Sequence, residues 1–276
     1  MTEVEKREMS TEQYFRQELD SDTGVMTLTM ERPDNNRNQI NTILLEQLRD
    51  IIVPELSYPR LRGMVIISGY EKVFSTGADI DGDLGLVGDA GAHRFVKLGS
   101  DVFQMLNSLR CMTVSCIAGF ALGGGLELAQ ATDFRISTAN ARLGQPEINL
   151  GMIPGWGGTQ RLPRLIGPQR ARWMMYSGEP ITGKTGQEWG LIDEVVESYG
   201  ELLPAAQKML AKLLTKSSRA LAAAKRAMNV GTEMSLRDGL DYEVEVFSNC
   251  WSTPDRKEGF AAHFEKRKPV WPGYPD

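Results

Sequence analysis

Two glutamates in apolar surroundings, each close to a glycine-rich turn, are the residues of this sequence best suited to acid–base chemistry. Glu127 lies in "GFALGGGLELA", just after Gly123, Gly124 and Gly125, and Glu147 follows in "GQPEINLG". Burial and mutual repulsion raise the pKa values of paired carboxyl groups toward neutrality, which suits proton transfer. The alternative is structural, with Glu147 pinning a loop and Glu127 facing solvent. The apolar neighbours of Glu127 argue against solvent.

The row of glycines has two interpretations, which this stretch alone leaves about even. At a strand-to-helix turn, glycines expose backbone amides that can stabilise an oxyanion, but they also let a helix pack closely on a strand. A second stretch, "VFSTGADIDGD" from Val73 to Asp83, follows the apolar run "GMVIISG" and places another glycine among small residues. Because it offers a second backbone amide, it favours the oxyanion interpretation.

The segment "GEPITGKT", Gly178 to Thr185, matches the spacing of a phosphate-binding loop but lacks its context. Such a loop follows a buried strand and opens a long helix, whereas the preceding "RARWMMYSG" has a helical pattern. Pro180 has no amide hydrogen to offer a phosphate. A phosphate-binding loop is accompanied by an acid on a later strand, and the only candidate for this acid is Asp193. It comes just eight residues after Thr185, which leaves too little room for a helix, a turn and a returning strand. We therefore expect a connection between helices here and no nucleotide site.

The composition is ordinary for a soluble globular protein. The chain has 276 residues, of which 41% are hydrophobic and 24% charged, and its net charge of −5 argues against a nucleic-acid partner. Its apolar runs fall short of the roughly 18 residues of a membrane span, and the polar start has no signal-peptide pattern. Three cysteines without a CxxC motif indicate reduced thiols and a cytoplasmic location, and two histidines make Cys/His catalysis a poor match. The cysteines and histidines are Cys111, Cys116, Cys250, His93 and His263.

The elements that would position these residues alternate between strands and helices. We expect a polar extension over residues 1–20, an α/β core over 21–200 and a helical region over 201–276. In the core, strands are expected at 24–33, 62–69 and 112–122, and helices at 38–56 and 93–109. The helical region is too thin to bury its own apolar faces, so it should pack on the core or on another subunit.

Three separated motifs in order resemble the crotonase (enoyl-CoA hydratase/isomerase) superfamily: "FSTGADI", "GFALGGGLELA" and "GQPEINLGMIPGWGGTQRLPRLIG". The similarity extends from Gly24 to Pro269, including the closing "RKEGFAAHFEKRKP". The resemblance implies a spiral core of ββα turns and a helical C-terminal trimerisation region. It also implies self-association as a trimer or dimer of trimers.

The resemblance implies roles for individual residues. The amides of Ala78 and Gly124 match the family's oxyanion hole, and Glu127 and Glu147 match both catalytic acids of the hydratases. In that scheme Glu127 takes a proton from water and Glu147 supplies one to Cα, with the division between acid and base left open. The residues implied to contact coenzyme A or the acyl group are Thr76, Ala78, Asp79, Ile80, Gly124, Trp156 and Lys266.

With both acids present, the implied activity is hydration of a 2-enoyl-CoA thioester in acyl-CoA degradation. No metal and no separate cofactor are expected, because coenzyme A is part of the substrate. The alternatives are an isomerase, a hydratase for branched or cyclic enoyl-CoA and, as a different class, a noncatalytic RNA-binding member. Trp156 has two interpretations, as the boundary of the acyl pocket or as a packing residue. His263 either contacts coenzyme A or lies on the surface.

Overall fold

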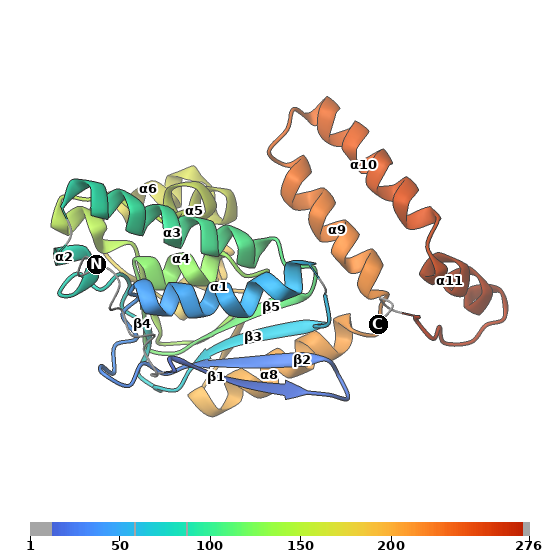
Figure 1. Cartoon of the computed structure of the whole chain (residues 1–276), viewed down its shortest axis with the longest axis horizontal. Helices are drawn as coiled ribbons and strands as arrows, with labels where there is room; N and C mark the ends of the chain where they lie inside the picture. Colours follow the sequence, from blue (N-terminus) through green and yellow to red (C-terminus); the bar gives the residue numbers. More distant parts are fainter. Residues whose placement is uncertain (1–12, 58, 87, 273–276) are drawn as a thin grey trace, which may run out of the picture.

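Two sheets form the centre of the computed structural model, which describes residues 13–57, 59–86 and 88–272 (Figure 1). The larger sheet has six strands in the order β1-β2-β3-β5-β7-β10, parallel except for the β1–β2 pair. The smaller has four, in the order β4-β6-β8-β9, with β9 antiparallel. The larger sheet comprises β1 Phe15–Asp20, β2 Val25–Met30, β3 Gly63–Ser68, β5 Met112–Ile117, β7 Phe134–Thr138 and β10 Glu194–Val196. The smaller comprises β4 Val73–Ser75, β6 Phe120–Leu122, β8 Arg142–Gly144 and β9 Ile181–Thr182.

The core is a spiral in which successive turns of chain add one strand to each sheet. Each of the pairs β3–β4, β5–β6 and β7–β8 places its first strand in the larger sheet and its second in the smaller, and helices follow. This confirms the α/β prediction and the ββα turns. β3 and β5 are buried along their whole length, as expected for parallel strands covered on both faces.

One expected strand is wrong in its extent. Residues 112–122 form β5 and β6, which belong to different sheets, rather than one continuous strand. Between them Gly119 has a φ of +61°, and a Cβ at this position would overlap the carbonyl of Lys72. The chain turns sharply here because only glycine fits the contact, and no pattern of apolar residues marks that contact in the sequence.

Helices cover both faces of the larger sheet. Side chains of α1 and α3 join the main apolar core on one face, and α8 packs on the other with residues such as Leu202, Ala206 and Leu210. The helices of the core are α1 Thr42–Ser57, α2 Asp83–Leu86, α3 Asp89–Asn107, α4 Gly124–Gln130, the 3₁₀ helix η2 Pro146–Leu150, α5 Gly158–Ile166, α6 Pro168–Ser177, α7 Gly183–Trp189 and α8 Tyr199–Leu213. Within the described residues, no helix combines the length and apolar character needed to cross a membrane.

Both ends of the core differ from the sequence expectation. Phe15–Asp20, predicted as part of a polar extension, form β1 and pair with β2 along six residues. Only Phe15 of this edge strand is buried, so the segment carries no alternating apolar signal. Residues 1–12 of the predicted extension lie outside the described residues. At the other end, the region predicted to be helical from residue 201 has two parts: α8 packs on the core, and the helices that project from the core begin at Ser218.

Three helices project from the core: α9 Ser218–Gly231, α10 Leu236–Trp251 and α11 Pro254–Phe264 (Figure 1). Ser217 caps α9, with its hydroxyl accepting a hydrogen bond from the amide of Ala220. A buried ion pair ties α9 to the core, since Lys225 Nζ lies 2.8 Å from Asp133 Oδ2. The same Nζ donates to the carbonyl of Cys111 at 3.1 Å.

Candidate functional site

A cavity of about 500 Å³ opens where the first turns of the spiral meet α3 and the loop after η2. Its lining includes the glycine-rich turn before α4, the loop after β4 and both glutamates. Its rim is apolar and exposed at Ile80, Leu150, Met152 and Ile153. The sequence-predicted residues that line it are Thr76, Ala78, Ile80, Gly124, Glu127, Glu147 and Trp156. Seven predicted residues from separate motifs therefore share one cavity.

Glu127 is a buried acid held by backbone amides. It lies in the first turn of α4 with 2% of its surface exposed, which excludes the solvent-facing alternative. Its Oε1 accepts hydrogen bonds from the amides of Trp156 and Gly158, both at 2.7 Å. Burial raises the pKa of Glu127 to about 7, while these two bonds and the charge of Arg161 oppose the rise. The carboxyl group is thus fixed in place and titrates near neutrality.

Glu147 faces the same cavity from η2. It is partly buried, and burial raises its pKa to about 7, with the neighbouring charge of Glu127 adding to the rise. Two acids with similar, raised pKa values at one cavity tend to hold one proton between them. Such a pair can remove a proton at one position in the cavity and donate a proton at a neighbouring position.

Each glycine in the row 123–125 is required by a different contact. A Cβ on Gly123 would lie 2.9 Å from Glu147 Oε1, and Gly123 has a φ of +51°. A Cβ on Gly124 would overlap the ring of Trp156, and one on Gly125 would overlap the carbonyl of Ser75. Gly125 therefore packs against β4, as the packing interpretation expects, while Gly123 and Gly124 line the cavity.

The amides of Ala78 and Gly124 lie close together on the cavity wall. The flanking amides of the Ala78 loop are engaged, because Gly77 N donates to Ser75 Oγ and Asp79 N donates to the carbonyl of Ile40. Ile40 forms a parallel bridge with Ala78 by bonding to Gly77 and Asp79 on either side of it, so the amide of Ala78 is directed away from Ile40. A Cβ on Gly124 would lie 3.5 Å from Ala78 N, and Gly124 begins α4, where amides have no acceptor within the helix.

Trp156 forms a wall of the cavity and is 3% exposed. Its indole meets Phe95 and Phe103 edge to face, with ring centroids 5.3 and 5.5 Å apart. A Cβ on Gly99 of α3 would overlap the same indole. The ring of Trp156 thus packs into the core and also lines the cavity.

Two predicted contact residues do not line the cavity. Asp79 is buried beside it and pairs with Arg32, whose Nη1 lies 2.8 Å from Asp79 Oδ2. Its Oδ1 accepts from the amide of Gly82 at 2.9 Å, so this carboxylate braces the loop that carries Ala78. Lys266 is exposed just after α11, which belongs to the projecting helices and lies away from α4 (Figure 1). His263 is also exposed and meets Phe264 edge to face.

The segment that resembles a phosphate-binding loop joins two helices, as predicted. It follows α6 and leads through β9 into α7, a helix of seven residues. The hydroxyl of Thr182 caps α7 by accepting from the amide of Thr185 at 3.1 Å. The glycines and lysine of this segment therefore form a turn and a short helix, without the long helix of a phosphate site.

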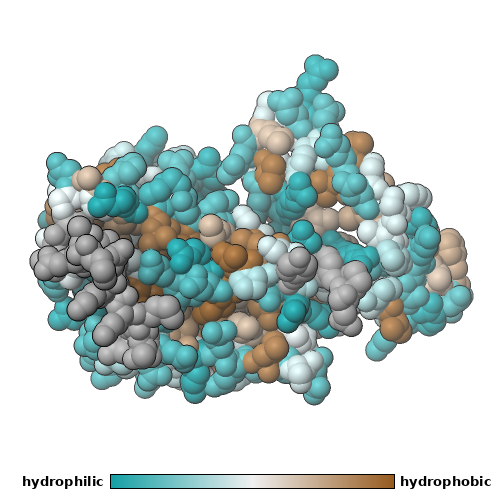
Figure 2. Space-filling model, in the orientation of Figure 1, coloured by the Kyte–Doolittle hydropathy of each residue, from teal (hydrophilic) through white to brown (hydrophobic). Residues whose placement is uncertain are grey.

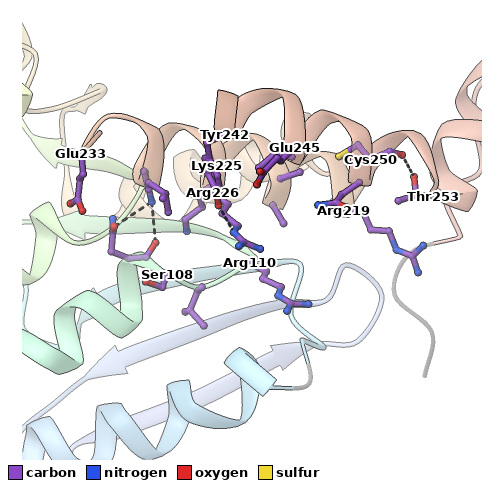
Figure 3. Close-up of a pocket in the computed structure, with 18 of the residues that line it drawn as sticks. Ser108, Arg110, Arg219, Lys225, Arg226, Glu233, Tyr242, Glu245, Cys250 and Thr253 are labelled. Carbon is purple, nitrogen blue, oxygen red and sulfur yellow. Dashed lines mark hydrogen bonds between the residues drawn. The ribbon is translucent and has the colours of Figure 1, made fainter. Parts of the chain in front are cut away.

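A second cavity, of about 600 Å³, lies between the α9–α10 hairpin and the end of α3 (Figure 3). In Figure 3 Lys225, Arg226 and Tyr242 extend from the hairpin and Ser108 lies across from them. Polar groups here serve as internal ties, such as the Arg226 Nε bond to the hydroxyl of Tyr242 at 2.6 Å. The carboxylates of its lining, Glu233 and Glu245, are exposed. Buried paired acids beside backbone amides distinguish the first cavity as the candidate active site.

Two buried glutamines behind Glu147 had no predicted role. Gln145 and Gln130 are 0% and 3% exposed, and Gln145 contacts both Gln130 and Glu147. Gln145 stands two residues before Glu147 in a motif already singled out, and Gln130 interrupts the apolar face of α4. The polar side chain of Gln130 in a largely apolar helix is the one sequence signal for this pair. Its partner, Gln145, lies on another element, so the sequence does not show the contact.

Comparison with known proteins shows the family to which the chain is similar. A family model described as enoyl-CoA hydratase/isomerase matches residues 20–274. A crotonyl-CoA hydratase from Syntrophomonas wolfei is 36% identical over 250 residues, covering 91% of this chain and 95% of that protein. A short-chain-enoyl-CoA hydratase from Clostridium acetobutylicum is 36% identical over 251 residues, with the same shares covered. The crystal structure of an enoyl-CoA hydratase from Bacillus anthracis has a TM-score of 0.88 at 33% identity, covering 95% of this chain and 100% of that one.

Proposed function

The chain belongs to the enoyl-CoA hydratase/isomerase family of the crotonase superfamily and is an enoyl-CoA hydratase; on this premise we propose that Glu127 and Glu147 add water across the double bond of a 2-enoyl-CoA thioester. The observation that carries the proposal is the meeting of two acids of raised pKa with two close backbone amides at one cavity. Coenzyme A enters as part of the substrate, and no separate cofactor is proposed.

The amides of Ala78 and Gly124 would bind the thioester oxygen. When water adds to Cβ, the electrons of the double bond move toward this oxygen and it becomes negative. Two fixed amide donors then stabilise the enolate more strongly than the neutral thioester. The glycine row supports this role, because a side chain at position 124 would collide with Trp156 and displace the amide.

The two acids would share one water molecule. Ionised Glu127 takes a proton from the water as its oxygen bonds to Cβ, and protonated Glu147 gives its proton to Cα as the enolate returns to a thioester. The step therefore starts with one proton on the pair and ends with one proton on the pair, now on Glu127. Transfer of that proton back to Glu147 restores the enzyme.

A short or compact acyl group is the substrate class that the cavity favours. The indole of Trp156 stands directly beside Gly124 and is held by Phe95 and Phe103, so it limits the space beyond Cβ. The names of two relatives, crotonyl-CoA hydratase and short-chain-enoyl-CoA hydratase, point the same way. Thr76 and Ile80, which also line the cavity, would contact the coenzyme A portion.

We also propose that the chain associates with itself through the projecting helices. Apolar side chains recur along one side of α10 and are more than two-fifths exposed, and apolar residues reach the surface of the projection (Figure 2). They are Leu236, Leu240, Val244, Phe247 and Trp251, which we call the α10 stripe. An exposed apolar helix face of this kind is typical of a subunit contact. Association would also allow Lys266 of one subunit to reach coenzyme A on another.

The experiment that tests the activity is incubation with crotonyl-CoA in ¹⁸O-labelled water, followed by mass analysis. Hydration predicts a product that is heavier by one water and carries the label. A product of unchanged mass would indicate an isomerase and contradict the proposal. A panel of straight, branched and cyclic enoyl-CoA thioesters then ranks the acyl groups by kcat/KM.

A further inference from the structure

Two buried glutamines form a chain of amides that ends on Glu147. Gln130 is the last residue of α4, one turn after Glu127, and Gln145 directly precedes η2, which carries Glu147. Neither glutamine lines the cavity that holds the two acids. The hydrogen bonds of the two glutamines reach the cavity through Glu147.

The orientation of the Gln145 amide follows from its neighbours, since oxygen and nitrogen are distinguished here by their partners. With its NH₂ toward Glu147, Nε2 lies 3.0 and 3.2 Å from the two carboxyl oxygens, and Oε1 accepts from Gln130 Nε2 at 3.0 Å. The reverse orientation would set oxygen against carboxyl oxygen and NH₂ against NH₂. Donation thus runs from Gln130 to Gln145 to Glu147.

Gln130 has one buried atom whose hydrogen-bonding capacity is not met within the part of the chain that the structure describes, which costs stability. Its Oε1 is buried without a hydrogen-bond partner among the described residues. A methionine of similar volume would fill the same space without an unpartnered oxygen. The feature that Gln130 supplies and methionine lacks is the Nε2 donor aimed at Gln145.

We propose that Gln130 is a positioning residue, which fixes the Gln145 amide with its NH₂ toward Glu147 and so orients the carboxyl group and stabilises its ionised form. The inference rests on the proposed hydratase function, in which Glu147 must release a proton in every turnover. Donors to the carboxylate favour that release. Without Gln130, the oxygen of Gln145 loses its donor and the amide is free to turn.

Charged groups surround the hydrogen-bonded glutamines, and replacing a glutamine by methionine leaves all of these groups in place. Glu127 of α4 faces Glu147, and Arg161 of α5 acts on Glu127. A groove on the far side of Gln130 has the charged lining residues Asp133, Arg135, Arg161, Arg164, Lys225 and Glu233. Replacing either glutamine by methionine removes no charge, so a shift in titration would come from the lost hydrogen bonds.

The test is a double-mutant cycle on the full-length enzyme with Gln130→Met, Gln145→Met and both changes together. Hydration of crotonyl-CoA is followed from about pH 6 to about pH 9. Gln130→Met is expected to lower kcat roughly tenfold with KM within about twofold, and to move the alkaline limb of the profile up by about half a unit or more. The limb moves up because a less stabilised carboxylate holds its proton to higher pH. The double variant should match Gln145→Met alone, since Gln130 acts through Gln145.

Leu128→Met is the matched control, since Leu128 is also buried on α4 but lies outside the amide chain. Its pH profile should equal that of the wild type. An unchanged profile for Gln130→Met, or effects of the two glutamine changes that simply add, would overturn the inference while the hydratase function stands. A wild-type protein that hydrates no enoyl-CoA would instead overturn the proposed function, and this inference with it.

Discussion

Trp156 and Glu127 are joined by a 2.7 Å hydrogen bond from the backbone amide of Trp156 to Glu127 Oε1. The indole of the same tryptophan packs against Gly124, the first residue of the helix that carries Glu127. One residue thus supports an acid through its main chain and bounds the cavity through its side chain. The position of the Glu127 carboxyl group and the size of the cavity are therefore both determined by Trp156.

Replacing Gly124 by alanine is expected to lower both stability and activity. The added Cβ overlaps the ring of Trp156, which is enclosed by Phe95 and Phe103 and cannot move aside freely. Overpacking of this kind costs about 1–3 kcal/mol in the free energy of unfolding, measured by urea denaturation. Gly200→Ala is the control, because a Cβ there meets nothing within 4 Å. Equal stability of the two variants would contradict the packing account.

Replacing Trp156 by phenylalanine is expected to change substrate preference. The smaller ring leaves room beside Gly124, while the backbone amide that donates to Glu127 is unchanged. The ratio of kcat/KM for an eight-carbon enoyl-CoA to that for crotonyl-CoA should rise roughly tenfold. A ratio equal to that of the wild type would show that Trp156 serves packing alone.

Substituting Glu127 by glutamine is expected to stabilise the fold at alkaline pH. Because the folded pKa is about 7 and the ordinary value is 4.5, the folded state binds more protons than the unfolded state between these values. The wild type therefore loses stability as pH rises from about 4.5 to about 7. Urea unfolding of Glu127→Gln should show a gain over wild type that is about 1–3 kcal/mol larger at about pH 8 than at about pH 5.

Glu127→Gln keeps the oxygen that accepts hydrogen bonds from two backbone amides, since Oε1 of glutamine can still accept from Trp156 and Gly158. Glu188→Gln on α7 is the control, because Glu188 is exposed. If the gain of Glu127→Gln were the same at both pH values, the raised pKa would not be the cause.

Disruption of the α10 stripe is expected to dissociate the protein. Val244 is 64% exposed at the middle of the stripe, so Val244→Asp leaves the monomer fold intact but places a charge in the proposed contact. Light scattering should give an oligomer for the wild type and a lower mass for this variant. Glu243→Gln, on the same helix, should keep the wild-type mass. A monomeric wild type, or an oligomer unaffected by Val244→Asp, would contradict self-association through this face.

The sequence predicts which residues gather at one cavity better than it predicts the limits of the elements. Glu127 and Glu147 were identified because each lies in a local motif whose neighbours restrict its environment. The division of residues 112–122 into two strands depends on the approach of Lys72 to Gly119, which is a tertiary contact. The strand β1 was missed because a single buried residue gives no alternation.

The role of Asp79 shows the same limit. Its place in "STGADI" suggested contact with coenzyme A, but its side chain pairs with Arg32, which is distant in sequence. Likewise Gln130 and Gln145 meet only after α4 and η2 have packed together. Residue types and spacing predict which groups are chemically suitable, whereas the contacts that orient them depend on the folded chain.

The most direct test of the central claim is the rate of crotonyl-CoA hydration by the wild type, Glu127→Gln, Glu147→Gln and the control Glu188→Gln. The two acids are predicted to act together on one water, so each of the first two changes should lower kcat by about 10²–10⁴-fold. Glu188→Gln should retain the wild-type rate. If the wild type does not hydrate crotonyl-CoA, or if either Glu127→Gln or Glu147→Gln retains its full rate, the two-glutamate account is contradicted.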